Sequence, residues 1–221
     1  MPSGRTEIFL MKKIICLMLA LLMLAIPLAS CDKNKTPAFE DIDLSTIDSL
    51  DNVSVTEDET DYVLITVKDY GKILVRLFPD VAPETVANFK KLVSENFYDG
   101  LIFHRVIKNF MIQGGDPEGT GAGGSPDKIK GEFTNNGFEN NLKHVRGVVS
   151  MARRGDDMNS ASSQFFICQK DYAYGDGDYA SFGFAAYGMD VVDKIANVRT
   201  NANDKPYVRV TIESIEFAEV K

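Results

Sequence analysis

The chain has 221 residues, of which 44% are hydrophobic, which is enough to fill one well-packed globular core. Its formal net charge at pH 7 is -8. Sites that grip phosphate backbones need clustered lysine and arginine, so we expect no nucleic-acid partner.

The first thirty residues have the pattern of an export signal. The pair Lys12-Lys13 precedes an apolar run over residues 14–28, which is short for a membrane span but suits a signal peptide. The run ends in Leu28-Ala29-Ser30-Cys31, which resembles the lipobox of bacterial lipoproteins. That resemblance implies cleavage before Cys31, a lipid on its sulfur, and an extracytoplasmic protein anchored to a membrane of the cell envelope. The alternative is an ordinary secretory signal cut near Ser30.

The next segment, residues 32–60, is expected to form a flexible tether. It contains nine acidic and two basic residues, and such an excess of one charge disfavours collapse. The predicted organisation is therefore a signal peptide over residues 1–30, a lipidated Cys31 with an acidic tether over 31–60, and one folded domain over 61–221. A free tether favours a monomer.

The folded domain begins with the pattern of a β-hairpin. Two β-branched runs, 62–67 and 72–77, are joined by a turn that contains Gly71. Pro83 then stands where the first turn of a helix tolerates proline. Apolar residues follow it at helical spacing, which predicts a helix over residues 83–96.

Short strand-like runs dominate the rest of the chain, and a second helix is predicted near residues 189–197. The runs cover 101–107, 110–113, 147–151, 164–168, 182–185 and 209–217. A glycine-rich loop over 114–124 lacks the Gly-Lys-Ser/Thr ending of a phosphate-binding loop. Cys168 stands in an apolar strand with no other cysteine in the predicted domain. This setting favours a small buried hydrophobic residue over a nucleophile. Many short strands with two helices predict a mainly β fold, an antiparallel barrel capped by helices.

Two stretches closely resemble the signature of the cyclophilins. The first runs from Phe103-His104-Arg105 to Gly115-Asp116, and the second joins Ser150-Met151-Ala152 to the later run from Ser162 to Ile167. The resemblance keeps one register from about Tyr62 to Val220. It implies a closed eight-stranded antiparallel barrel with two capping helices. It also implies a peptidyl-prolyl cis-trans isomerase that uses no cofactor or metal and forms no covalent intermediate.

The resemblance also assigns roles that suit this reaction. The twisted transition state returns the lone pair to the prolyl nitrogen, so a fixed cation or N–H donor stabilises that state more than either ground state. Arg105 is implied as this donor, and Gln113 as the group that holds the substrate backbone. Phe110, Met111 and Phe166 are implied as the dry pocket for the proline ring.

Further substrate contacts are implied around the rim, at His104, Ala152, Arg153, Tyr174 and Tyr179. Tyr174 stands where many cyclophilins have a tryptophan, Tyr179 where a histidine is frequent, and Arg153 where an asparagine is common. His104 precedes Arg105 on a strand and so faces the other way, which favours a structural or rim histidine over an acid–base group.

Two functions remain open from the sequence. The first is an isomerase that acts on X-Pro bonds of exported or surface proteins as they fold. The second is a chaperone or adaptor module that binds proline-containing segments with little turnover, which the altered rim would allow. One geometric question also stays open. Met111 and Gln113 share a strand face, so Phe110 must reach the pocket from the strand's start or from a bend.

Overall fold

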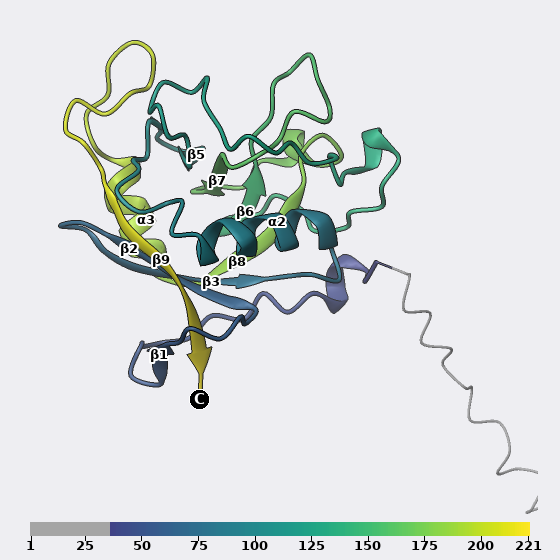
Figure 1. Cartoon of the computed structure of the whole chain (residues 1–221), viewed down its shortest axis with the longest axis horizontal. Helices are drawn as coiled ribbons and strands as arrows, with labels where there is room; N and C mark the ends of the chain where they lie inside the picture. The colour runs from purple at the N-terminus through teal and green to yellow at the C-terminus, as the bar shows by residue number, and fades with distance from the viewer. Residues whose placement is uncertain (1–35) are drawn as a thin grey trace, which may run out of the picture. The chain divides into compact units, whose positions relative to one another are not determined.

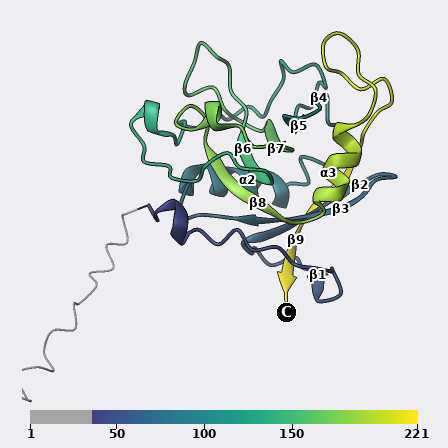
Figure 2. The same ribbon diagram turned by 180° about the vertical axis from the view of Figure 1, so that it is seen from behind.

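A computed structural model describes residues 36–221, and the predicted signal peptide and the lipid site at Cys31 lie outside these residues. Within them, nine strands form one antiparallel sheet in the order β1-β9-β2-β3-β8-β6-β7-β5-β4 (Figures 1 and 2). The strands are β1 (Val53–Val55), β2 (Tyr62–Val67), β3 (Gly71–Leu77), β4 (Arg105–Ile107), β5 (Met111–Gly114), β6 (Val148–Met151), β7 (Phe165–Cys168), β8 (Ser181–Tyr187) and β9 (Ile212–Val220). The helices are α2 (Pro83–Ser94) and α3 (Met189–Ala196).

This mainly β architecture with two helices confirms the predicted fold class, but a closed eight-stranded barrel is not confirmed. The ladder of paired strands ends at β4 on one side and at β1 on the other. Residues just before β4 meet the chain leading into β9 through an isolated bridge between Ile102 and Thr211. The stretch 101–104, predicted as strand, is instead irregular, so β4 is only three residues long.

The hairpin and the two helices form where the sequence predicts them. β2 and β3 pair from Tyr62 opposite Arg76 to Val67 opposite Gly71, and Asp69 takes the left-handed conformation that the tight turn requires. The N-terminus of α2 is capped by a residue far away in the sequence. The buried Glu132 carboxylate accepts the backbone N–H groups of Glu84 and Thr85 at 3.0 and 2.7 Å. Among residues 36–221, no helix has the length and apolarity to cross a membrane.

The main core is built from one face of the sheet and the buried faces of both α2 and α3. Phe89 of α2 packs against Phe165 and Phe182 with ring centroids 5.6 and 5.1 Å apart. Alternate residues of β2 and β3, such as Val63 and Ile73, point into this core. Cys168 is a buried free thiol whose pKa burial raises to about 12, which confirms its reading as a hydrophobic residue.

The expectation of a flexible tether is corrected for residues 36–60, which pack against the outside of the sheet (Figure 1). We call residues 36–60 the strap. Ile42 is 8% exposed and packs in a cluster with Phe78 and Phe184. Asp43 forms an ion pair with Arg76, and β1 pairs with β9. Apolar side chains spaced among the acidic ones explain the correction, because their burial outweighs the repulsion between exposed carboxylates.

The strap also covers apolar residues of the hairpin that face away from the core. Leu64 and Leu74 alternate with core residues, and both are buried under a cluster that includes Ile47, Leu50 and Val53 of the strap. The backbone N–H of Ile47 donates to the carbonyl of Ala186 on β8 at 2.9 Å. The compact unit of the chain therefore begins at Thr36 rather than at residue 61.

Candidate active site

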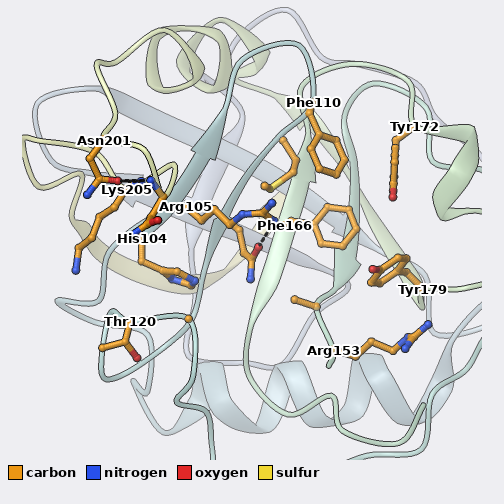
Figure 3. Close-up of a pocket in the computed structure, with 15 residues that line it drawn as sticks. His104, Arg105, Phe110, Thr120, Arg153, Phe166, Tyr172, Tyr179, Asn201 and Lys205 are labelled. Carbon is orange, nitrogen blue, oxygen red and sulfur yellow. Dashed lines mark hydrogen bonds between the residues drawn. The ribbon is translucent and has the colours of Figure 1, made fainter. Parts of the chain in front are cut away.

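A row of three side chains crosses strands β4, β5 and β7. Arg105 lies directly opposite Gln113, and Gln113 lies directly opposite Phe166. Directly paired residues project from the same face of a sheet, so the cation, the amide and the aromatic ring share one surface. This surface is the floor of a cavity of about 450 Å³, drawn in Figure 3.

The polar part of this floor is held by a chain of hydrogen bonds. Arg105 Nη1 donates to Gln113 Oε1 at 3.4 Å, and Gln113 Nε2 donates to Gln164 Oε1 at 2.8 Å. Gln164 Nε2 in turn donates to the carbonyls of Gly121 and Gly123 at 3.1 and 2.7 Å. The orientation of the Arg105 side chain is thereby connected to the glycine-rich loop. Sequence reasoning singled out Arg105 and Gln113 but gave Gln164 no role.

The apolar part of the floor answers the question left open about Phe110. A tight turn joins β4 to β5, with Asn109 in the left-handed conformation and the Phe110 N–H bonded to the Ile107 carbonyl at 3.1 Å. Phe110 therefore enters from a bend just before β5, whereas Met111 enters from the strand itself. Met111 is 1% exposed and packs with Phe166. Phe110, Met111 and Phe166 together line the apolar part of the cavity.

A loop over residues 172–179 builds the opposite wall and corrects one predicted contact. Tyr174 is 89% exposed and does not line the cavity. Tyr172 takes the position instead, with its ring 4.4 Å from that of Phe110. Gly175 explains the exchange, because a Cβ there would lie 2.7 Å from the Tyr172 ring. The glycine leaves room for Tyr172 to turn inward, and the short 3-10 turn Ala173–Gly175 carries Tyr174 outward.

Tyr179 and Arg153 also belong to this wall. The Tyr179 ring meets Phe166 edge-on at 5.7 Å. The Arg153 guanidinium lies 5.1 Å from the ring centroids of both Tyr179 and Phe133, and its Nε donates to the Asp178 carbonyl at 2.8 Å. With a side chain only 10% exposed, Arg153 chiefly supports the Tyr179 ring from beneath.

Behind Phe166 lies a buried polar group that sequence reasoning missed. The His144 ring stacks on Phe166 with centroids 6.0 Å apart and an interplanar angle of 16°. Its Nδ1 is 3.0 Å from Asp176 Oδ1 and its Nε2 is 3.0 Å from Ser150 Oγ. Burial lowers the pKa of His144, and the hydrogen bond with Asp176 opposes part of this effect. A neutral ring then donates from Nδ1 to the carboxylate and accepts at Nε2 from the serine.

His104 lines the cavity at its other end, beside the glycine-rich loop. It is 4% exposed, and neither ring nitrogen has a hydrogen-bond partner among the described residues. Burial lowers the pKa of His104, so the ring is neutral near pH 7. The loop itself is organised by the buried Asp116 carboxylate, which accepts backbone N–H groups from residues 118, 120 and 121. These bonds tie the backbone of the loop to one of its own carboxylates.

The structure thus brings most of the predicted residues together at one cavity and leaves Tyr174 outside. The predicted residues that line it are His104, Arg105, Phe110, Met111, Gln113, Ala152, Arg153, Phe166 and Tyr179. The lining residues without a predicted role are Thr120, Gly121, Tyr172, Asn201, Asn203 and Lys205. The first two belong to the glycine-rich loop over 114–124, which the resemblance to cyclophilins already implies as a lining of the substrate groove, although no single residue of it was given a role.

The cavity combines an aromatic pocket with the guanidinium groups of Arg105 and Arg153 and the ammonium group of Lys205 at its border. It has the size of small-ligand sites in proteins. Cys168 lies directly opposite Met111 on β7 as a buried protonated thiol, so it supplies no nucleophile. The arrangement suits recognition of an apolar ring next to an amide, and stabilisation of charge that develops on that amide.

Comparisons with known proteins agree with this arrangement. The family model described as "Cyclophilin type peptidyl-prolyl cis-trans isomerase/CLD" matches residues 62–217. The isomerase ppi1 of Schizosaccharomyces pombe is 43% identical over 137 residues, covering 62% of this chain and 86% of that protein. A putative bifunctional phosphatase/peptidyl-prolyl cis-trans isomerase of Streptococcus pyogenes is 42% identical over 182 residues, which cover 69% of this chain but only 38% of that longer protein.

A solved structure supports the same conclusion. The cyclophilin-type isomerase of Cryptosporidium parvum, determined in the presence of the dipeptide Ala-Pro, superposes with a TM-score of 0.65 at 33% identity, covering 70% of this chain and 97% of that one. The family match spans most of the chain, from β2 to β9, and includes the cavity built from Arg105, Gln113 and Phe166. The chain belongs to the cyclophilin-type peptidyl-prolyl cis-trans isomerase family.

Proposed function

We propose that this protein accelerates the cis-trans isomerisation of X-Pro bonds in exported or surface polypeptides as they fold. The observation that carries the proposal is the cross-strand row of Arg105, Gln113 and Phe166, which sets one cation beside an apolar pocket. Family membership supports the same reaction. A lipid on Cys31 would hold the enzyme at a membrane of the cell envelope, as the sequence motif suggests.

The reaction needs stabilisation of a twisted amide and no bond cleavage. Amide resonance sets a barrier of about 18–20 kcal/mol, and rotation localises the lone pair on the prolyl nitrogen. In our proposal the proline ring lies against Phe110, Met111 and Phe166, while an Arg105 N–H donates toward that nitrogen. Because the lone pair is available only in the twisted state, this hydrogen bond favours the transition state over both ground states.

Gln113 has a supporting part in this mechanism. Its side-chain oxygen meets Arg105 and its nitrogen meets Gln164, so the amide is fixed in one orientation. It can therefore hold the guanidinium and bind the substrate backbone at the same time. Orientation, water exclusion and one electrostatic contact together would have to lower the barrier by about 7 kcal/mol to give five decades of acceleration.

The test is NMR exchange spectroscopy on a short Ala-Pro-Phe peptide with the purified protein. We expect the protein to accelerate exchange and Arg105→Ala to lose about 10²- to 10³-fold of the rate, because one preorganised donor is removed. Peptide-induced shifts in the protein spectrum should persist. Arg209→Ala is the matched control, since Arg209 is an exposed arginine that does not line the cavity.

Other outcomes would contradict parts of the proposal. Peptide binding without acceleration by the wild-type protein would favour the binding-module function. Acceleration that survives in Arg105→Ala would remove the arginine from the mechanism. The membrane anchor is tested separately in cells, where Cys31→Ser should release the protein from the membrane fraction and a retained association would contradict lipidation at this residue.

A further inference from the structure

The loop over residues 199–208, which joins α3 to β9, has an ordered turn at its tip. Asn201 organises the turn: its N–H donates to the Lys205 carbonyl at 2.9 Å, and its Oδ1 accepts the N–H groups of Asn203 and Lys205 at 2.9 and 3.0 Å. A bridge between Thr200 and Pro206 closes the base. The tip therefore holds its shape through its own hydrogen bonds.

The tip also docks on the catalytic side of the sheet. β4 is the last strand of the ladder, and the N–H of its central residue, Val106, donates to the Asp204 carbonyl at 2.8 Å. Lys205 Nζ donates to the carbonyl of Gly119 in the glycine-rich loop at 2.8 Å. One short turn thus covers the free edge of β4 and connects it to the glycine-rich loop. Figure 3 shows Asn201 and Lys205 on one side of Arg105 and Phe166 on the other.

Asp204 is held in an unusual conformation at this docking point. Its φ of 60° is in the left-handed region, which costs energy for any residue other than glycine and which aspartate and asparagine tolerate best. This backbone conformation leaves its carboxylate beside the catalytic strand, with Oδ2 at 3.5 Å from Nε of Arg105. Asp204 does not itself line the cavity.

We infer that Asp204 is a positioning residue for Arg105. Its carboxylate faces Nε, and Gln113 Oε1 faces Nη1 at 3.4 Å, so the guanidinium is held along two of its edges. The guanidinium carries five N–H groups in a rigid fork, and fixing two edges directs the remaining ones toward the cavity. This inference rests on the proposed isomerase function, because it assigns a task to the donor of that reaction.

The expected effect is modest because the pair is partly in water. The side chains of Arg105 and Asp204 are 42% and 41% exposed, so solvent screens their attraction. Without Asp204, a guanidinium held by Gln113 alone would spend less time aimed at the substrate. We expect about a two- to fivefold lower exchange rate at saturating peptide, in the range that exposed ion pairs provide. Peptide affinity should stay within about twofold, because the apolar pocket provides most of the binding.

The experiment compares Asp204→Asn and Asp204→Gly with the wild-type protein. Both replacements tolerate a positive φ, so the turn should keep its shape, whereas alanine would be strained there. Asp190→Asn is the matched control, because it removes the same charge from an exposed ion pair, with Lys194 on α3. Three quantities are measured for each protein: the exchange rate at saturating Ala-Pro-Phe, the peptide dissociation constant, and the NMR signal of the Arg105 Nε–H, assigned with Arg105→Lys.

The inference predicts that both Asp204 variants slow exchange at nearly unchanged affinity and shift the Arg105 Nε–H signal. The glycine variant should show the larger effect, since asparagine keeps an acceptor oxygen. Wild-type or faster exchange in both variants, or an equal loss in Asp190→Asn, would overturn it. If the wild-type protein fails to accelerate exchange, the proposed function fails, and an unchanged Arg105 signal in both variants would still overturn the positioning role.

Discussion

The floor of the cavity and the loop that faces it are built in different ways, and we call them the strand wall and the loop wall. Arg105, Gln113 and Phe166 stand on paired strands, where register alone sets them on one face. Tyr172 and Tyr179 stand on a loop, where their positions depend on a glycine, a buried histidine and an arginine that packs beneath a ring. In the proposed mechanism, the strand wall therefore carries the chemistry on rigid backbone, and the loop wall can vary while the chemistry is kept.

The largest effect is expected from the strand wall. Phe166 is 4% exposed and touches both Met111 and the His144 ring. Phe166→Ala should lower the free energy of unfolding by about 3 kcal/mol and abolish accelerated exchange, because it removes buried surface and pocket wall together. Urea unfolding and peptide exchange would measure the two effects. Tyr174→Ala is the control: an 89% exposed side chain outside the cavity should change neither quantity.

The loop wall should respond differently. Arg153→Ala removes a guanidinium that supports Tyr179 and donates to the Asp178 carbonyl. We expect a loss of about 2 kcal/mol in unfolding free energy and weaker peptide binding, with the exchange rate at saturation preserved. Arg154→Ala is a matched neighbour, since its side chain is 63% exposed, and should cost less than about 0.5 kcal/mol. If Arg153→Ala lowers the exchange rate at saturating peptide, the loop wall also contributes to catalysis and the two walls are not independent.

The smallest expected effect is a pH dependence of stability. Burial lowers the pKa of His104 and of His144 below the ordinary value of 6.5 in the folded protein. The unfolded chain therefore binds more protons below pH 6.5, so the stability of the fold must fall as the pH is lowered. Between pH 7.5 and 6 the loss should reach up to about 0.8 kcal/mol for each histidine.

Urea unfolding at several pH values would measure this dependence. His144→Gln should reduce the slope, because one of the two histidines no longer titrates. A stability that is flat over this interval, together with imidazole NMR signals that titrate near pH 6.5, would contradict the burial of both rings.

The same contrast between strands and loops decides what the sequence could predict. Strand residues follow a period of two and pair by register, so the row through Arg105 could be anticipated from the pattern and from the resemblance to cyclophilins. Tyr172 could not be distinguished from Tyr174, because the choice depends on the space beside Gly175. Asp204 lies far from Arg105 in the sequence, and only the folded loop brings the two together.

The strap was missed for a different reason. Its acidic residues give it a strong negative charge, and its equally numerous hydrophobic residues, such as Ile42 and Leu50, follow no regular period. A signal was nevertheless present in the hairpin, where Leu64 and Leu74 are apolar on the face that alternates with the core. A strand with two apolar faces needs a cover on each, and the segment just before it in the sequence was available to supply one.

The docked strap also bears on the proposed lipid anchor, because it sets how far the domain could lie from Cys31. A free spacer of thirty residues could extend to roughly 100 Å, so a tethered domain could move that far from its anchor. Because the compact unit begins at Thr36, only four residues, 32–35, and hence five Cα–Cα steps, separate it from Cys31. If Cys31 carries the proposed lipid, those five steps hold Thr36 within about 17 Å of the lipidated residue. The domain would then stay close to the bilayer surface, and its substrates would be polypeptides that lie at or emerge from that surface.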